Sequence, residues 1–298
     1  MLDRNETMKR PLNIAHRGGA GLWPENTLLA LREASRAGFD GAEIDVQMTR
    51  DGALVVFHDF ALTPQLCRDG EGRWLKRRRG EPLPLIRALT LSQLKAFDVG
   101  RVKPRSVYAR LRKPLHSQDG ERIPLLSEAI ASIKGFRKDF RLFIEIKTSY
   151  DDRSLSAAPE EVADAVIEEL RHARFLHHAV LVGFDWPALI HAKKLEHALP
   201  CWFTTRKRRR GRAPAPWAGG FDPRKFGGSI PKAIAAAGGQ GWLCSRWQAT
   251  PRAFASAREC GLQFGVWTVN EKPAMRRFNR LGVDAIITDR PDRLASLL

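Results

Sequence analysis

Short apolar runs rich in β-branched and aromatic residues recur along the chain, and longer amphipathic stretches separate them. Such runs predict strands, whereas apolar positions spaced three and four apart predict helices. Helical patterns lie between most of the runs, and strands that alternate with helices indicate βαβ units and a parallel sheet. The predicted strands are Leu12–His16, Ala42–Gln47, Leu54–His58, Leu142–Ile146, Ala179–Val182, Cys201–Thr204, Gly241–Cys244, Phe264–Val269 and Ala285–Thr288. The clearest predicted helices are Thr27–Ala37, Glu160–Arg171, Ala188–His197, Pro251–Glu259 and Pro273–Leu281.

These nine strands are one more than a closed (β/α)₈ barrel contains. Only Met48–Ala53 separates the second strand from the third, and a parallel crossover needs a dozen or more residues. These two strands are therefore predicted to form an antiparallel hairpin. A two-residue turn would pair Glu43 with His58, and a three-residue turn with Gly52 left-handed would pair Ile44 with His58. We expect an α/β fold, a TIM (β/α)₈ barrel with a β-hairpin after strand 2, and an open doubly wound sheet is the alternative.

Two stretches do not follow the alternation of strands and helices. Residues 59–123 are turn-rich and basic, with only Ser92–Phe97 helical in pattern, and they are predicted to be an insertion over the active-site end. Residues 206–228 open with a basic run and are predicted to be a second loop. We therefore expect residues 1–298 to form a single TIM-barrel catalytic domain with the insertion 59–123.

Composition places the chain among globular proteins, since 43% of its residues are apolar and 28% are charged. Its four cysteines have no CxxC spacing, which argues against a zinc site or a disulfide framework and fits a reducing compartment. No run of 18 apolar residues exists to span a membrane, and the first ten residues lack the apolar region of a secretory signal. We expect a cytoplasmic protein.

The formal net charge is +17, which attracts anions such as nucleic acid, an acidic membrane surface or phosphorylated small molecules. A genome biased toward arginine codons would produce the same charge. The basic run 206–210 has no interleaved aromatic residues to stack on bases, and no nucleic-acid-binding motif is present. Composition cannot choose among these anions, but the two observations on motifs lead us to expect no nucleic acid partner, while weak contact with an anionic membrane surface is possible.

Ionisable and aromatic residues follow or occupy the carboxyl ends of several predicted strands, where barrel enzymes place their active sites. Taken singly, each has a structural explanation, such as a hydrogen-bonded core histidine or a surface ion pair. Their repeated placement at one rim is harder to explain structurally, because ionisable groups in apolar strands are costly to bury unpaired. The residues are His16, Arg17, Glu43, Asp45, His58, Glu145, Lys147 and Trp267.

These residue types suit metal-assisted attack on a phosphodiester. Three carboxylates without a thiol form a hard oxygen site, which favours Mg²⁺ or Ca²⁺ over zinc. Arginine and lysine would add positive charge around the same phosphate. Two histidines can transfer protons near neutral pH, one taking a proton from the nucleophile and the other giving one to the leaving alkoxide.

Eight short motifs, spread in order over about residues 12–293, resemble those of the glycerophosphodiester phosphodiesterase family. The motifs are His16-Arg17-Gly18, Pro24-Glu25-Asn26-Thr27, Glu43-Ile44-Asp45-Val46, Thr49-Arg50-Asp51-Gly52, Val55-Val56-Phe57-His58-Asp59, Ile144-Glu145-Ile146-Lys147, Val266-Trp267-Thr268-Val269-Asn270 and Thr288-Asp289-Arg290-Pro291-Asp292. The resemblance implies a TIM barrel that hydrolyses glycerophosphodiesters to glycerol 3-phosphate and an alcohol.

By position in these motifs, the resemblance also implies the role of each candidate residue. His16 and His58 would be the acid/base pair. The metal ligands would be Glu43, Asp45 and Glu145, with Mg²⁺ or Ca²⁺ as the cofactor. Arg17 and Lys147 would contact phosphate, and Trp267 would pack near the glycerol part. The nucleophile is either water or the glycerol 2-hydroxyl. The turn at Glu25 and Asn26 reads as a mainly structural helix start.

Two other functions compete with this one. The first is a lysophospholipase D-type phosphodiesterase with the same chemistry, which the basic loops 76–79 and 206–210 would dock on anionic lipid beside an apolar patch, such as one around Trp74. The second is a non-catalytic protein that binds nucleic acid or phosphorylated ligands, against which the full set of histidines and carboxylates argues. The sequence assigns neither the head group nor the oligomeric state.

Overall fold

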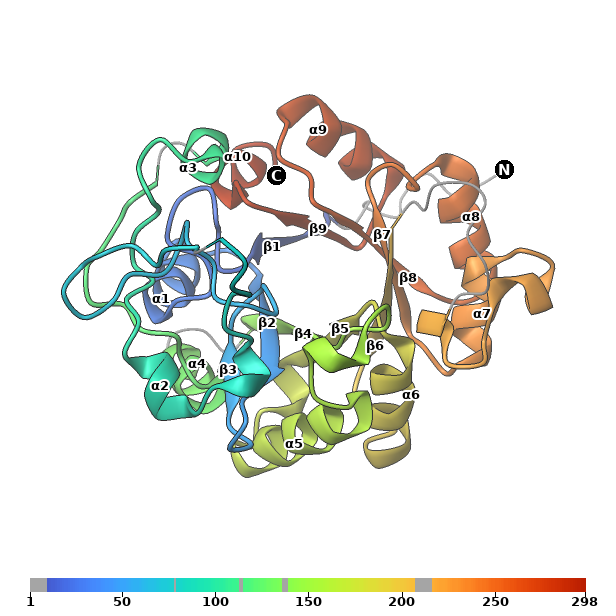
Figure 1. Ribbon diagram of the computed structural model, residues 1–298. Coiled ribbons are helices and arrows are strands. Elements are labelled where there is room, and N and C mark those ends of the chain that lie inside the picture. The colour runs from blue at the N-terminus through green and yellow to red at the C-terminus, as the bar shows by residue number, and fades with distance from the viewer. Residues whose placement is uncertain (1–9, 78, 113–114, 136–138, 207–215) are drawn as a thin grey trace.

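A computed structural model describes residues 10–77, 79–112, 115–135, 139–206 and 216–298. Eight parallel strands form a closed barrel, because β1 pairs with both β2 and β9, and β3 joins β2 as an antiparallel ninth strand. Figure 1 shows the closed sheet ringed by helices. The predicted TIM barrel with one added hairpin is confirmed. The strands are β1 (Leu12–His16), β2 (Gly41–Met48), β3 (Leu54–Val56), β4 (Arg141–Ile146), β5 (Ala179–Gly183), β6 (Cys201–Thr205), β7 (Gly241–Ser245), β8 (Gln263–Trp267) and β9 (Ala285–Thr288).

Helices follow most of the strands and pack on the outside of the barrel (Figure 1). They are α1 (Leu28–Arg36), α2 (Leu91–Lys95), α3 (Val107–Leu111), α4 (Leu126–Ile133), α5 (Pro159–His172), α6 (Trp186–Leu195), α7 (Ile230–Ala236), α8 (Pro251–Glu259), α9 (Lys272–Leu281) and α10 (Pro291–Ala295). The main core lies between these helices and the outer faces of the strands, and a second apolar cluster fills the barrel interior. None of the helices in the described ranges has the length and apolar character needed to cross a membrane.

The hairpin follows the second of the two registers considered above. Val46 pairs with Val56 and Met48 with Leu54, which makes a three-residue turn with Gly52 at a φ of +80°. The predicted third strand is two residues too long, because β3 ends at Val56. Beyond that point the backbone amide of Phe57 still donates to Asp45, but the chain then turns away from the ladder.

The insertion lies beside this hairpin and carries an apolar cluster of its own. Alternate residues of β3, together with Phe57 after it, pack into two different cores. Leu54 and Val56 face the main core, whereas Val55 and Phe57 face the cluster of the insertion. The prediction of a single helical stretch here is wrong, since α3 is helical as well as α2. With five residues and no buried side chain, α3 lacks the apolar periodicity by which a helix is predicted. Arg78 and the run 207–210 lie outside the described residues.

Candidate active site

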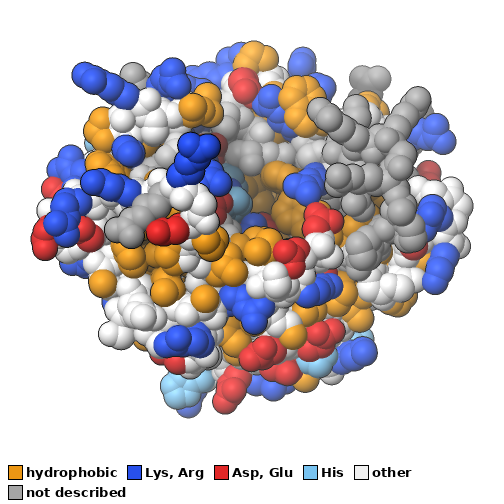
Figure 2. Space-filling model, in the orientation of Figure 1, with side chains coloured by type: hydrophobic (Ala, Val, Ile, Leu, Met, Phe, Trp, Pro, Cys, Tyr) orange, Lys and Arg blue, Asp and Glu red, His pale blue; other side chains and the backbone are white. Residues whose placement is uncertain are grey.

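The register of the parallel strands brings four candidate side chains together at the carboxyl end of the barrel. His16 at the end of β1 lies beside Glu43 of β2, and Asp45 of β2 lies beside Glu145 of β4. Glu43 and Asp45 are two residues apart and so lie on the same face of β2. Figure 2 shows a hollow in this face of the molecule, with Lys and Arg side chains spread around it.

Three carboxylates form a compact cluster at this end. Glu43, Asp45 and Glu145 each offer one oxygen, and these oxygens lie within 4.8 Å of one another. Ligands that share one Mg²⁺ or Ca²⁺ ion span about 4 to 5 Å, so the cluster could hold a single divalent ion. Lys147 counters part of the negative charge, with its Nζ 2.9 Å from Glu145 Oε1 and 3.5 Å from Asp45 Oδ1.

The two buried carboxylates of β2 differ in their electrostatic surroundings. Burial raises the pKa of Glu43 well above its usual range, and the charges of Asp45 and Glu145 raise it further. Burial acts in the same direction on Asp45, but the nearby His58 and Arg17 outweigh it and hold the pKa of Asp45 below its usual range. The site therefore concentrates negative charge that a bound cation would stabilise.

Arg17 connects most of the groups in the site. Its backbone N–H donates to Glu43 over 3.0 Å, and its Nε lies 3.3 Å from Asp45 Oδ2. Its terminal nitrogen donates to Glu25 over 2.9 Å, and Glu25 in turn pairs with Arg112 of the insertion. Burial lowers the pKa of Arg17, but the surrounding carboxylates raise it overall, so the guanidinium stays charged.

The turn before α1 does more than start a helix. Asn26 has a φ of +56°, and its amide nitrogen donates to Asp45 Oδ2 over 2.8 Å while its amide oxygen accepts from the Asp45 N–H over 3.3 Å. The helix itself is capped by Thr27, whose hydroxyl accepts from the Ala30 N–H. The mainly structural interpretation of this turn was therefore incomplete, because Asn26 fixes the orientation of a candidate metal ligand.

Both candidate histidines are held at one ring nitrogen by a carboxylate. His16 Nδ1 lies 2.6 Å from Asp289 Oδ1, and His58 Nδ1 lies 2.7 Å from Asp59 Oδ1. Burial would raise the pKa of Asp289, but His16 outweighs it and keeps the pKa low; His58 likewise helps to lower the pKa of Asp59 to about 2. Ionised carboxylates only accept hydrogen bonds, so each Nδ1 donates and each Nε2 is left to exchange a proton. His16 Nε2 lies 3.8 Å from Glu43 Oε2.

Asp289 and Asn270 belong to the site, although sequence reasoning assigned them no role. Asn270 donates to Asp289 Oδ2 over 2.8 Å and accepts from the Asp289 N–H over 2.9 Å, so it fixes the carboxylate that holds His16. The signal that could have found them is barrel closure, because the first and last strands of a closed barrel are neighbours. Here Ala15 is paired with Thr288.

Trp267 lies at the carboxyl end of β8, where its partly buried indole borders the barrel interior. Its ring meets Phe184 edge to face, with centroids 5.2 Å apart, and its Nε1 has no hydrogen-bond partner among the described residues. The structure thus places all eight predicted residues at the carboxyl ends of the strands or directly after them. Hydrogen bonds and ion pairs join six of them into one network, and His58 is near enough to Asp45 to lower the pKa of its carboxyl.

Comparisons with known proteins agree with this arrangement. The model of the glycerophosphoryl diester phosphodiesterase family matches residues 16–293. A glycerophosphodiester phosphodiesterase of Caldanaerobacter subterraneus subsp. tengcongensis is 28% identical over 97% of this chain and 98% of its own length. A crystal structure from Silicibacter pomeroyi DSS-3, of a protein provisionally named a glycerophosphoryl diester phosphodiesterase, is 31% identical, covers 95% of this chain and 91% of its own, and superposes with a TM-score of 0.84.

A more distant structure shares the fold. It is an Oleispira antarctica phosphodiesterase in complex with its product sn-glycerol-3-phosphate, 23% identical over 96% of each chain with a TM-score of 0.70. The family match extends from His16 in the first strand to Arg293 in the last helix, and so spans the barrel and all the site residues described above. This chain belongs to the glycerophosphoryl diester phosphodiesterase family and is a phosphoric diester hydrolase.

Proposed function

We propose that this enzyme hydrolyses glycerophosphodiesters to glycerol 3-phosphate and an alcohol, with a divalent metal ion and a pair of histidines that transfer protons. One observation carries the proposal: three carboxylates and two cations form a cluster whose Glu43 lies beside His16 and whose Asp45 is affected by the charge of His58, and each histidine is held at Nδ1 by an aspartate. Membership of the family supports the substrate class.

The charges of the cluster fit a divalent ion and a phosphodiester together. Glu43, Asp45 and Glu145 outnumber the cations of Arg17 and Lys147 by one when all are ionised. A divalent ion and a singly charged phosphodiester would together bring the site to neutrality. Mg²⁺ or Ca²⁺ held by the three carboxylates would supply a positive charge next to the phosphate oxygens in the transition state.

The contacts of the two histidines support a role in general acid and base catalysis. Because Nδ1 of each ring donates to its aspartate, Nε2 of His16 and Nε2 of His58 are the atoms that take up or release a proton. One of them would accept the proton of the attacking hydroxyl, and the other would protonate the departing alkoxide.

The remaining site residues would bind and orient the substrate. Arg17 and Lys147 are buried cations at the edge of the carboxylate cluster, where they can donate to non-bridging phosphate oxygens. Trp267 would pack its ring against the glycerol carbons. The insertion takes part through Arg112, which pairs with Glu25 behind Arg17. We therefore treat the barrel and the insertion 59–123 as one catalytic domain.

The reaction is tested by release of glycerol 3-phosphate from glycerophosphocholine and glycerophosphoethanolamine by the purified protein. Release that requires Mg²⁺ or Ca²⁺ and that stops in EDTA is expected, because the three carboxylates repel one another and a phosphate when no ion is bound. Activity should return when the metal is restored. Full activity after dialysis against EDTA would contradict the metal-dependent mechanism, and no release with either metal would contradict the substrate class.

Asp289→Asn is expected to lower kcat at least about tenfold with little change in KM, because the amide no longer fixes His16 as the Nδ1–H tautomer. Metal affinity should stay unchanged, since Asp289 is not in the carboxylate cluster. The measurement is steady-state hydrolysis of glycerophosphocholine at saturating metal. Asp292→Asn is the matched control, because Asp292 pairs with Arg290 in the next helix, away from His16. Equal losses in both variants would contradict a positioning role for Asp289.

A further inference from the structure

We propose that the face carrying the active site docks on an anionic phospholipid bilayer through two apolar contact points, one on each side of the site. The first is α3 in the insertion, and the second is the loop that follows β7. The proposal concerns where the enzyme works, and it does not depend on the catalytic roles proposed above.

The first contact point is the outer face of α3. Val107 and Leu111 are 58% and 79% exposed, and their spacing of four residues places them on one side of the helix. The described residues 102–112 around them contain four lysines and arginines and no aspartate or glutamate. Exposed aliphatic side chains within a basic segment are typical of surfaces that insert between anionic lipid head groups.

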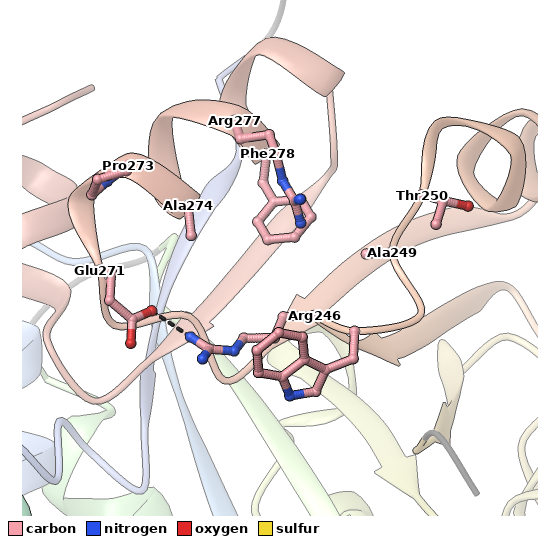
Figure 3. Close-up of a pocket in the computed structure, with 9 residues that line it drawn as sticks. Arg246, Ala249, Thr250, Glu271, Pro273, Ala274, Arg277 and Phe278 are labelled. Carbon is pink, nitrogen blue, oxygen red and sulfur yellow. Dashed lines mark hydrogen bonds and ion pairs between the residues drawn. The ribbon is translucent and has the colours of Figure 1, made fainter. Parts of the chain in front are cut away.

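The second contact point is Trp247, whose side chain is 69% exposed. The guanidinium of Arg246 lies 4.5 Å from the centroid of its ring and also pairs with Glu271. An apolar pocket lies next to it, with Ala274 and Phe278 in its lining, and Figure 3 shows Arg246 reaching Glu271 at its edge. Tryptophan beside arginine is favoured at the level of the head groups, where the ring meets both apolar and polar groups.

Hydrogen bonds and ion pairs tie both contact points to the active site. Arg112, the residue after α3, pairs with Glu25, which holds Arg17. On the other side, the Arg246 N–H donates to the Trp267 carbonyl over 2.8 Å at the end of the barrel. The loop after β7 follows the carboxyl end of a barrel strand, and α3 is joined through Arg112 and Glu25 to Arg17 of the site, so a bilayer that touched both would face the entrance of the site.

The chemistry of the two contact points favours lipid over nucleic acid. The positive charge comes chiefly from the segment around α3, because at the second contact point Arg246 is already paired with Glu271. A basic surface alone would suit either anion. Trp247 could stack on a base as well as insert among head groups, so α3 is the contact point that discriminates. Val107 and Leu111 have no aromatic face on which bases could stack, whereas burial in a bilayer removes them from water. The Trp74 patch expected from the sequence is not the most exposed one, because Trp74 is partly buried beside Arg68.

Sedimentation of the full chain with vesicles tests the proposal. We expect binding to vesicles of phosphatidylcholine mixed with phosphatidylglycerol and little binding to phosphatidylcholine alone, with the difference reduced by salt. The double variant Leu111→Ser/Trp247→Ser should bind the anionic vesicles at least about tenfold more weakly than the wild type, because two apolar anchors are lost. Leu195→Ser is the matched control, since Leu195 is 36% exposed at the end of α6, on the opposite side of the barrel.

Hydrolysis of water-soluble glycerophosphocholine should be unchanged in the double variant, which also shows that it folds. Wild-type protein that does not bind anionic vesicles would overturn the proposal, and so would a double variant that binds them as well as the control does. Binding to a single-stranded oligonucleotide without binding to vesicles would assign the basic rim to nucleic acid instead. Vesicle binding without any hydrolysis would contradict the proposed function and leave the docking surface intact.

Discussion

Replacing His16 with alanine is expected to slow the hydrolysis of glycerophosphocholine by about 10²- to 10⁴-fold, the usual contribution of a positioned acid or base. The ring is fixed by Asp289 at Nδ1, and its Nε2 lies 3.8 Å from Glu43 at the edge of the carboxylate cluster. Neither neighbour can replace it, because both carboxylates are already engaged. The measurement is kcat/KM at saturating metal, together with a metal titration that should match that of the wild type.

His191→Ala is the matched control for this prediction. His191 also pairs with an aspartate, Asp164, over 2.7 Å, but it does so on the outer helices. The control variant should therefore lose a His–Asp pair without any loss of rate. If His16→Ala kept more than about a tenth of the wild-type rate, His16 would not be a catalytic acid or base.

Glu145→Gln is expected to weaken binding of the divalent ion at least about 100-fold, since even residues that only support metal ligands contribute 10- to 100-fold. The substitution keeps the size of the side chain but removes one of the three charges of the cluster. Lys147, which lies 2.9 Å from Glu145 in the wild type, would then repel the ion more strongly. Calorimetric titration with Mg²⁺ measures the loss, and activity should partly recover at high metal concentration.

A second glutamate–lysine pair provides the control. Glu128 of α4 pairs with Lys95 of α2 and is not a member of the carboxylate cluster, so Glu128→Gln removes a comparable ion pair outside the site. We expect unchanged metal affinity for this variant. Unchanged affinity for Glu145→Gln as well would remove Glu145 from the proposed ligand set.

The barrel was predictable because its strands are short, apolar and regularly spaced, and every strand end lies within two residues of the prediction. The site was predictable where charged residues interrupt those strands. Glu43 and Asp45 share one face of β2 by simple alternation. The sequence narrowed the hairpin register to two alternatives, because the length of the turn decides the register. The structure contains the longer turn, which Asp51-Gly52 fits.

The remaining contacts of the site join residues that are far apart in the sequence, and local sequence patterns do not predict such contacts. Asp289 is hydrogen-bonded to His16, which is 273 positions away in the sequence, and Arg112 donates to Glu25, which is 87 positions away. The short helix α3 has no buried side chain, so no periodic apolar face predicts it. Its two exposed apolar residues are visible as a surface feature only once the loop around them is folded.

The division of β3 between two cores has a consequence for how this enzyme can diversify. Val55 and Phe57 are the residues through which the return strand meets the separate core of the insertion, and the barrel uses only the alternate positions. The part of the insertion after Asp59, residues 60–123, can therefore be exchanged as a block between relatives while the catalytic strands and the aspartate that holds His58 stay as they are. Such a graft must bring apolar partners for Val55 and Phe57 and a cation in place of Arg112, because Glu25, 6% exposed, would otherwise depend on Arg17 alone.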